Sequence, residues 1–488
     1  MRVSFFTVFA SVALLSACAG TDGIAPRSTL KDSTQVGTGE AIRAALADAQ
    51  WPQDGWWTRW GDPQLDRLVT LAITDNPEID IAQARLDQAN GIARIAGAAD
   101  KPTVSANGVF SRERYAAYAN PNPPGGNTVW SNEVGVDLSY DLDLWGKNRA
   151  TLEGALDAVQ ASAADYREAR LLLETSVVRT YVTLSQQYEL RDNASATLGR
   201  EQRIYDIIDQ RNRAGLASRL DLSEARTPLA TTRAQIAQID RQIALTRDEL
   251  ATLIGQGPAA GDRLTRPTLR LDAPVALPAT LPAELVGHRP DVVAQRWRVE
   301  AAAKGIKAAR ADFYPNIDLI ASASLASAAF GGFFTFVSNN ALGHTFGAAI
   351  SLPIFDGGVR TGRYGVAVSG YDLAVATYNQ TVLSAFRSVA DQVVSLRSLA
   401  TQQAEIETSV QSAQQAFDYA EKGYRAGMSD YLNVLATETE LLRAQQSLAL
   451  ARAARLDAWA QLMMALGGGA ESGAPPHGPA PGGSAHAP

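Results

Sequence analysis

The sequence predicts a mixed α/β membrane protein built from two copies of one structural unit, each with two strands and a long helical hairpin. An internal duplication is the first observation behind this prediction, because residues 77–255 recur, diverged but in register, as residues 290–467. Asn76-Pro77 matches Arg289-Pro290, and further landmarks along both copies keep almost the same offset. Solenoid repeats run about 20–50 residues, so this much longer period indicates a duplicated unit.

A two-residue period inside each copy is the second observation. In the first copy, Val134, Val136, Leu138, Tyr140, Leu142 and Leu144 fall on one side, and Glu133, Asp137, Ser139, Asp141 and Asp143 fall on the other. This alternation predicts a strand with one apolar and one acidic face. The second copy repeats it over residues 316–325 and again over 345–352. We expect Asp137, Asp141, Asp143 and Asp318 to line an aqueous lumen.

The third observation is the length of the segments without helix breakers. Residues 155–198 and 371–422 contain neither glycine nor proline and are rich in good helix formers. A helix from about residue 148 to 213 would measure on the order of 95–100 Å, which is far longer than the average helix of about 11–12 residues. Before the strands, apolar residues at helical spacing predict a shorter helix over about 64–99, which Pro102 ends.

Glycines mark the tips of the two predicted hairpins. Gly215 and Gly427 follow the long helices, where glycine ends a helix favourably. Ser218 or Ser429 is then expected to start the returning helix as an N-cap residue. Pro228 lies within the returning helix of the first copy and is expected to kink it.

The N-terminus predicts export and lipidation. Residues 1–17 contain a short apolar run behind Arg2 and are predicted to be a secretory signal peptide, too short to remain as a membrane helix. Small residues precede the only cysteine, Cys18, and resemble a bacterial lipobox, so cleavage before Cys18 and lipid on it are expected. Ala19 rather than aspartate follows, which favours sorting to the outer membrane. An ordinary signal peptide that contains Cys18 is the alternative.

The strands are the remaining candidates for crossing the membrane, because no run of 18 apolar residues follows residue 18. A spanning sheet must close into a barrel, since an open edge leaves backbone groups unsatisfied in lipid. Four strands per chain cannot close, because about eight is the practical minimum. Two chains or three chains both satisfy this requirement, and an aqueous pore favours three. A soluble sandwich is the alternative interpretation of these strands.

The duplication and the composition divide the chain into segments. Residues 18–54 are expected to form an extended, lipidated anchor segment. Residues 55–262 form the first repeat, 263–284 link the repeats, and 285–467 form the second repeat. Residues 468–488 are rich in Gly, Pro and Ala and are expected to be disordered.

Two loops between strands are expected to face the exterior of the cell. They span residues 114–128 and 330–344. The second loop carries Phe330, Phe333, Phe334 and Phe336. These rings lie either at the lipid interface or over the mouth of the barrel, and the sequence leaves both positions open.

Several short motifs together indicate a family. They are Trp56-Trp57, Asp62-Pro63-Gln64-Leu65, Arg289-Pro290-Asp291-Val292, Ala309-Arg310-Ala311-Asp312-Phe313-Tyr314-Pro315, Leu352-Pro353-Ile354-Phe355-Asp356-Gly357-Gly358, Gly423-Tyr424-Arg425-Ala426-Gly427 and Tyr431-Leu432-Asn433-Val434-Leu435. Each motif alone is weak, but in this order they cover about residues 55–467. On these residues the chain resembles outer-membrane factors of the TolC type, most closely the NodT-like outer-membrane efflux lipoproteins.

The resemblance implies a homotrimer with a 12-stranded outer-membrane β-barrel, four strands from each chain, continued by a 12-helix α-barrel through the periplasm. It implies a passive exit duct of a tripartite pump for drugs, metals or metabolites, lipid-anchored in the bacterial outer membrane with most of the chain in the periplasm. The implied partners are a periplasmic adaptor (membrane fusion) protein, an inner-membrane pump of the RND type or an ABC transporter, and outer-membrane lipid.

The resemblance also implies a closed entrance at the hairpin tips, where the family uses tyrosines, arginines and acids. Tyr424 matches the family's tip tyrosine, but Ala436 and Thr439 stand where relatives often carry aspartate and arginine. The candidate gate residues are Tyr424, Arg425, Asp430, Glu438 and Glu421 at one tip, and Arg213, Arg219 and Asp221 at the other. Solvated polar residues near a turn are the alternative for each of them.

Other classes of function fit the sequence poorly. His288, His344, His477 and His486 have no ligand spacing, so no metal site and no cofactor is expected. No phosphate-binding glycine loop and no nucleophile elbow occurs, so no enzyme is expected. The formal net charge of −7 leaves no basic footprint for nucleic acid. A type I protein-secretion duct and a lipid-anchored coiled-coil scaffold remain as alternatives to efflux.

Overall fold

The computed structural model describes residues 23–32, 36–37, 39–47, 51–118, 125–270, 277–278, 285, 287–329 and 332–469. The predicted signal peptide and the predicted lipidation residue Cys18 lie outside these ranges, as does the stretch 470–488 of the predicted disordered tail. The chain divides into two compact units. The sheet unit contains Leu86–Ser162 and Gln295–Tyr378 with the residues up to Leu30, and the hairpin unit contains the rest.

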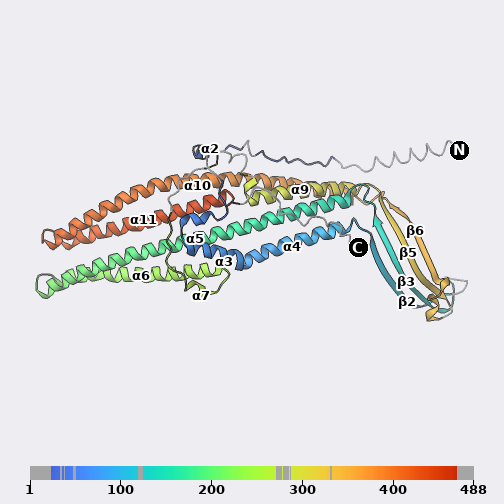
Figure 1. Cartoon of the computed structure of the whole chain (residues 1–488), viewed down its shortest axis with the longest axis horizontal. Helices are drawn as coiled ribbons and strands as arrows, with labels where there is room; N and C mark the ends of the chain where they lie inside the picture. Colours follow the sequence, from blue (N-terminus) through green and yellow to red (C-terminus); the bar gives the residue numbers. More distant parts are fainter. Residues whose placement is uncertain are drawn as a thin grey trace, which may run out of the picture. The chain divides into compact units, whose positions relative to one another are not determined.

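A four-stranded antiparallel sheet lies at one end of the sheet unit, beyond the helices, and each copy contributes two strands, as predicted (Figure 1). The first copy supplies β2 (Thr103–Arg114) and β3 (Thr128–Asp141), and the second supplies β5 (Asn316–Ala329) and β6 (Leu342–Ser351). The strand order is β2-β3-β5-β6, so β2 and β6 form the two free edges. The copies therefore meet at the central β3–β5 pair.

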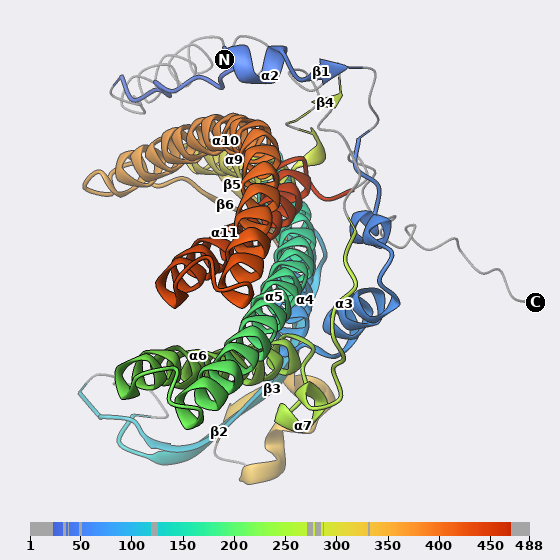
Figure 2. The same cartoon turned by 90° about the vertical axis from the view of Figure 1, so that its left-hand side faces the viewer.

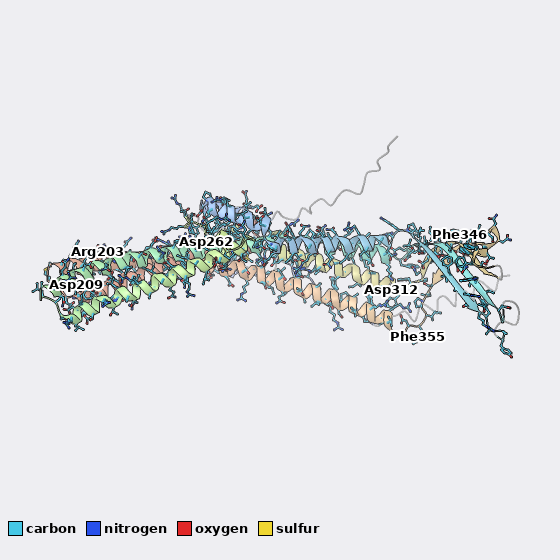
Figure 3. The ribbon with its side chains drawn as sticks, turned by 90° about the horizontal axis from the view of Figure 1, so that it is seen from below. Arg203, Asp209, Asp262, Asp312, Phe346 and Phe355 are labelled. Carbon is cyan, nitrogen blue, oxygen red and sulfur yellow. The ribbon has the colours of Figure 1, made fainter. Side chains whose placement is uncertain are left out.

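The strand register sorts the side chains onto two faces. Leu138 pairs with Val104 of β2 and Ala321 of β5, whereas the preceding Asp137 pairs with Ser322 on the other side. We call the even-numbered residues of β2, β3 and β6, with the odd-numbered residues of β5, the apolar face. The remaining strand residues form the polar face. Side chains such as Phe346, 82% exposed, show how open the apolar face is in a single chain (Figure 3).

The helix predicted over residues 64–99 is two helices, α3 (Pro63–Asp75) and α4 (Pro77–Ala98). The break lies at Asn76, whose φ of −81° and ψ of 125° are extended. Proline disfavours the helical conformation of the residue before it, so Pro77 accounts for this correction. In the second copy, α9 (Pro290–Ala311) likewise begins at a proline.

The two helical hairpins have matching lengths. α5 (Lys147–Arg213) and α10 (Val359–Arg425) have 67 residues each. The returning helices α6 (Arg219–Leu253) and α11 (Tyr431–Ala465) have 35 residues each. α6 continues through Pro228, which therefore lies inside the returning helix as predicted.

A tryptophan cluster packs the N-terminal part of the hairpin unit against α11. Trp56 and Trp60 of the short helix η3 (Trp56–Trp60) have ring centroids 5.7 and 5.8 Å from that of Trp459, and all three side chains are buried. Asp62, the N-cap of α3, accepts a 2.8 Å hydrogen bond from the hydroxyl of Tyr181 on α5. These contacts fix the beginning of α3 on the long helix.

Both copies end their helical hairpin with the same type of hydrogen bond. Asn76 Nδ2 donates to the main-chain oxygen of Leu253 at the end of α6, over 2.7 Å. Arg289 Nη1 donates to the main-chain oxygen of Ala465 at the end of α11, over 3.0 Å. The residue before each helix-starting proline therefore satisfies a carbonyl that the ending helix leaves without a partner.

The glycines that follow these carbonyls allow a close approach of two backbones. Gly255 and Gly467 have φ angles of +72° and +92°. A Cβ atom at either position would lie 2.1 Å from a main-chain oxygen, that of Asp75 in the first copy and that of His288 in the second. Only glycine fits both the dihedral angle and the space.

The segment predicted as an extended anchor contains some regular structure. Arg27 N and Ser28 N donate to Asp372 Oδ1 of α10, over 2.9 and 2.8 Å, so this stretch is extended along the helix. In the hairpin unit, α2 (Gly39–Arg43) is followed by β1 (Leu46–Ala47), which pairs in parallel with β4 (Leu277–Pro278). The segment predicted to be extended therefore also contains a short helix and a short strand.

Short elements complete the described chain. α7 (Pro258–Gly261) follows α6, and η4 (Phe333–Phe336) and η5 (Asn339–Ala341) lie between β5 and β6. Gly468 and Gly469, at the start of the tail predicted to be disordered, are packed instead. A Cβ atom at Gly468 would lie 2.1 Å from a methyl carbon of Leu171.

No helix within the described ranges is both long enough and apolar enough to cross a membrane.

Candidate functional site: the hairpin tips

Both hairpins turn through the same glycine motif, as predicted. Gly215 and Gly427 each have a φ of +74°. The main-chain N–H groups of the next residues, Leu216 and Met428, donate to the carbonyls of Arg211 and Gly423 over 2.8 and 2.9 Å. This pattern is the Schellman motif, which satisfies the last carbonyls of a helix. Figure 2 shows the two hairpins side by side.

The caps of the returning helices involve two predicted gate residues. Ser218 starts α6 through a capping box, in which its hydroxyl accepts from Asp221 N and the Asp221 carboxylate accepts from Ser218 N. In the second copy, Asp430 is the N-cap and accepts from Asn433 N over 3.1 Å. The expectation that Ser429 caps α11 was therefore wrong, since the aspartate one residue later serves instead.

A buried apolar cluster joins the two hairpins near their tips. Its members are Ile204, Ile208, Ala225, Phe417, Tyr424, Val434 and Leu441. Tyr424 is only 8% exposed, and its ring centroid lies 6.2 Å from that of Tyr431. The guanidinium of Arg211 lies 5.5 Å from the Tyr424 ring. This tyrosine is thus part of the packing between the hairpins of one chain.

Among the described residues, the ion pairs between the hairpins are Arg179–Asp457, Arg452–Glu189 and Arg200–Glu438, and the last of these lies nearest the tips. Arg200 Nε of α5 donates to Glu438 Oε1 of α11 over 3.1 Å, and the Glu438 side chain is 4% exposed. Burial raises the pKa of Glu438 to about 7, even though Arg200 favours its charged form. Glu201 and Glu421 add to the increase by repulsion. Glu438 therefore changes charge near neutral pH.

A second buried carboxyl lies beside this pair. Glu201 Oε1 accepts from Thr232 Oγ1 over 3.0 Å, and among the described residues Oε2 has no hydrogen-bond partner. Burial raises the pKa of Glu201 as well. The Tyr431 phenol has its pKa raised to about 12, mainly by burial and then by Glu438 and Glu201. The interface therefore places two buried carboxyls around a single arginine.

The remaining predicted gate residues make local contacts or lie in the open. Arg425 pairs with Glu421 one turn earlier on the same helix, over 2.7 Å. Arg213 pairs with Asp209 in the same way, also over 2.7 Å. Arg219 is exposed at the start of α6. Of the eight predicted residues, the structure thus brings Tyr424 and Glu438 into the interface between hairpins.

Arg200 and Glu201 are two interface residues that the sequence did not reveal. They lie inside a long helix with no local signal, and the partner of Arg200 belongs to the other copy. Counting from the tip glycines gives a usable signal. Arg200 lies roughly four helical turns before Gly215, and Glu438 lies roughly three turns after Gly427. Two residues at similar heights above the tips can therefore be expected to meet when the hairpins pack.

The predicted lumen residues share the polar face of the sheet, with one exception. Asp137, Asp141 and Asp318 belong to this face, and Asp141 pairs with Asp318. Asp143 lies beyond the end of β3 and has a φ of +41°. Its carboxylate accepts two main-chain N–H bonds of 2.9 Å from the first turn of α5. Asp143 is therefore a helix-capping residue, which corrects its assignment to the lumen face.

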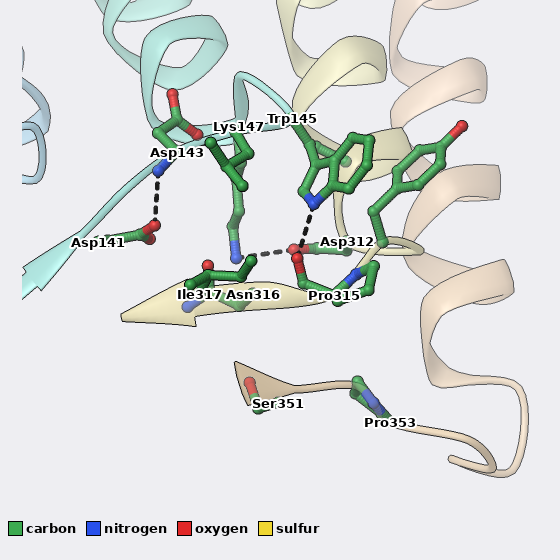
Figure 4. Close-up of a pocket in the computed structure, with 13 residues that line it drawn as sticks. Asp141, Asp143, Trp145, Lys147, Asp312, Pro315, Asn316, Ile317, Ser351 and Pro353 are labelled. Atoms are coloured by element: carbon green, nitrogen blue, oxygen red, sulfur yellow. Dashed lines mark hydrogen bonds and ion pairs between the residues drawn. The ribbon is translucent and has the colours of Figure 1, made fainter. Parts of the chain in front are cut away.

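A cavity of about 280 Å³ lies where the strands meet the helices (Figure 4). The Trp145 ring stacks on that of Tyr314 at 4.7 Å, and its Nε1 donates to the main-chain oxygen of Pro315 over 2.7 Å. Lys147 pairs with Asp312 over 2.7 Å. These contacts tie the junction between β3 and α5 in the first copy to the junction between α9 and β5 in the second.

No group of three or more His, Cys, Asp and Glu side chains in the part of the chain that the structure describes is arranged to hold a metal ion. The described residues do not include Cys18.

A sheet with one apolar and one acidic face, joined to paired 67-residue helices, defines the class as an outer-membrane channel subunit. The family model for outer membrane efflux proteins matches residues 68–256 and 281–468, once in each copy. This chain belongs to the outer membrane efflux protein family.

Curated relatives support the same conclusion. The fusaric acid resistance protein FusA of Burkholderia cepacia is 41% identical over 371 residues, which are 74% of this chain and 69% of that protein. The multidrug resistance outer membrane protein MdtP of Escherichia coli (strain K12) is 30% identical over an alignment of 492 positions that covers 97% of each chain.

Solved structures share the fold. The outer membrane protein VceC from Vibrio cholerae has a TM-score of 0.80 and 32% identity, covering 86% of this chain and all of that one. The outer-membrane channel OprN has a TM-score of 0.78 and 25% identity, covering 91% and 97%. These similarities confirm the predicted fold class, the efflux function and the outer-membrane location. The family and the fold are those of channel proteins.

Proposed function

We propose that this chain is the exit duct of a tripartite pump that exports small organic molecules. One observation carries the proposal. In each copy, two strands of a sheet with one apolar and one polar face are joined to a 67-residue helix. The names of FusA and MdtP, resistance proteins for fusaric acid and for multiple drugs, support organic compounds over metals as the substrate class.

The assembly proposed is a homotrimer. The four-stranded sheet has free edges at β2 and β6, and membrane strands cannot keep such edges open in lipid. Three copies close a ring of twelve strands in which β6 of one chain meets β2 of the next. The antiparallel order supports this join, because β2 and β6 run in opposite directions.

The proposed partners are a periplasmic adaptor and an inner-membrane pump of the RND type or an ABC transporter. Lipid on Cys18 would anchor the N-terminus in the outer membrane. The extended stretch at Arg27 and Ser28, bonded to Asp372, supports a tether that leads from a membrane anchor to α10.

The proposed gate is the interface between the two hairpins, with Glu438, Arg200 and Tyr424 as its central residues. Support comes from the burial of Glu438 and Tyr424 and from the 3.1 Å ion pair of Glu438 with Arg200 across α5 and α11. The tip residues Arg213, Arg219, Asp221, Arg425 and Asp430 would act around this centre. Opening would separate α10 and α11 from α5 and α6.

Two measurements test the duct. The purified full-length chain should form discrete channels in a planar lipid bilayer, and deletion of its gene in the source bacterium should raise accumulation of a fluorescent efflux substrate. A coiled-coil scaffold would give no channels. A protein-secretion duct would give channels, but the deletion would abolish secretion of a protein and leave small-molecule accumulation unchanged.

A further inference from the structure

The ionisable side chains of the sheet are sorted between its two faces. The carboxylates within the four strands are Glu113, Glu133, Asp137, Asp141 and Asp318, and all belong to the polar face. Both arginines of the strands, Arg112 and Arg114, belong to the apolar face. A charge on a lipid-facing surface is tolerated at the interface and costly at the midplane, so the height of these arginines matters.

Arg112 and Arg114 lie at the outer end of the sheet. β2 begins at Thr103, just after α4, and ends at Arg114, so both arginines are at the end of the sheet remote from α4 and α5. In an outer-membrane protein whose helices enter the periplasm, this end lies in the outer leaflet. About 7 Å separates their Cα atoms along the strand, so both guanidinium groups can reach one phosphate.

Aromatic rings surround Arg112 at the outer end of the sheet, which indicates that this end lies at a membrane interface. The guanidinium carbon of Arg112 lies 5.9 Å from the Trp130 ring, and Phe333 of η4 lies 5.2 Å from the same ring. Phe333 also stacks on Phe110 at 5.7 Å. Asn132 Nδ2 holds this loop by donating to the main-chain oxygen of Phe333 over 2.7 Å.

This arrangement decides a question that the sequence left open for Phe333. Trp130, Phe110 and Asn132 are all apolar-face residues, so Phe333 packs on the outside of the sheet. Aromatic girdles of membrane barrels lie at the height of the lipid head groups. The two arginines therefore lie where phosphate groups are found.

Within the described strands, no carboxylate shares the apolar face with Arg112 and Arg114. Residues 114–132 and 319–350 contain no aspartate and no glutamate, so the two outward loops carry no carboxylate. β6, which would meet β2 of a neighbouring copy, lies almost entirely within the second range. Glu113 and Glu133 are nearby in sequence but belong to the polar face.

We propose that Arg112, Arg114 and Trp130 form a binding site for the phosphate groups of the phosphorylated glycolipid of the outer leaflet. Arginine suits this role, because its planar fork of N–H donors matches phosphate oxygens and its flat face stacks on tryptophan. The site rests on the outer-membrane location and not on what the channel exports.

Native mass spectrometry of the purified full-length protein tests the site, with diphosphorylated lipid A as the probe. We expect the wild-type protein to bind it, and Arg112→Gln with Arg114→Gln to weaken binding by about tenfold or more, as loss of charge-assisted contacts requires. Arg112→Lys with Arg114→Lys should retain part of the affinity. Glu113→Gln, on the opposite face at the same height, is the matched control and should not weaken binding.

Three results would overturn the proposal. They are equal binding of fully dephosphorylated lipid A by the wild type, equal binding of phosphatidylglycerol, and unchanged affinity of the double glutamine variant. The first two need no variant and so do not depend on folding. Channel conductance of the double glutamine variant should equal that of the wild type, so failure of this site is distinguishable from failure of the proposed duct.

Discussion

Arg200 of α5 and Glu438 of α11 form an ion pair between the two hairpins of one chain, with 3.1 Å between Nε and Oε1. The arginine is 14% exposed and the glutamate 4%. Glu201 and Glu421 lie close enough to oppose the charge on Glu438. Because one arginine faces several carboxyls, the protonation of Glu438 decides how much charge the interface must hold.

We expect the hairpin interface to be more stable at pH 5 than at pH 8. Burial raises the pKa of Glu438 from 4.5 to about 7, so the unfolded chain releases this proton at a lower pH than the folded one. The stability contributed by this group is complete below pH 4.5 and is lost as the pH rises through 7. The loss amounts to about 3 kcal/mol for a shift of this size.

Hydrogen exchange of the α10–α11 amides, corrected for the intrinsic effect of pH, measures this dependence. Glu438→Gln, which is neutral at every pH, should flatten it. A variant that keeps the full dependence would assign the pH effect to other groups, with Glu201 first among them.

A double-mutant cycle should show that the ion pair is costly to break and inexpensive to replace. Arg200→Met leaves a buried carboxylate without its partner and should destabilise the chain at pH 8 by about 3–5 kcal/mol. Adding Glu438→Leu should recover most of this loss, since apolar side chains pack well in such a site. Denaturant unfolding measures both changes.

An exposed pair on the same hairpin provides the control for this cycle. Arg443 and Glu440 are 68% and 65% exposed. Arg443→Met should cost no more than about 1 kcal/mol, because solvent screens the interaction. Equal costs at the buried and exposed pairs would contradict the importance given to burial.

Two glycines in left-handed conformations should respond very differently to alanine. Gly467→Ala places a Cβ 2.1 Å from the main-chain oxygen of His288, so α11 can no longer end against the start of α9. Gly427 has a φ of +74° but open space around its Cα. Gly427→Ala should cost about 1–2 kcal/mol from the dihedral angle alone, and Gly467→Ala clearly more. Thermal unfolding compares the variants, and equal losses would refute the argument.

The order and length of the strands and long helices could be predicted from the sequence, because they depend on periodic patterns of apolar residues and on the positions of helix breakers. The two-residue period assigned the faces of β3, and the lack of breakers located α5 to within one residue at its start. The break at Asn76 was missed although Pro77 was visible, because the apolar stripe continues across it. A proline at the first position of a new helix and one inside a continuing helix look alike in sequence.

The candidate site was only partly readable for a different reason. Tyr424 and Glu438 were predicted because the family resemblance implies a gate at the glycine-marked tips, and Tyr424 matches the family's tip tyrosine. Asp430 and Asp221 lie at the same turns, but the backbone uses their carboxylates as caps. Arg200 was not predicted, because its role depends on the packing of α5 against α11, which no local sequence pattern indicates.

Cys18→Ser should abolish metabolic labelling of the protein with palmitate. Serine cannot accept the lipid by the thiol chemistry of a lipobox, so an uncleaved precursor or a soluble form should accumulate. Thr21→Ser, just beyond the expected cleavage site, should keep the label. Channel activity should survive in part, since the strands themselves hold the protein in the membrane. Normal labelling of Cys18→Ser would show that another residue carries the lipid, and a wild type without label would show that none does.

The closed resting state of the entrance should depend on residues near the tip of the second hairpin. Asp430→Ala removes the N-cap of α11, which destabilises the helix by about 0.5–2 kcal/mol. Glu438→Ala in the same chain removes the buried partner of Arg200. In a trimer each change occurs three times, so the hairpins should separate more readily. We expect higher single-channel conductance in planar bilayers and sensitivity of cells to vancomycin-sized antibiotics, without loss of the trimer on gels. Tyr424→Phe keeps the ring in the buried cluster and should leave conductance unchanged. If the double alanine variant conducts like the wild type, the gate lies elsewhere and these residues only stabilise the turn.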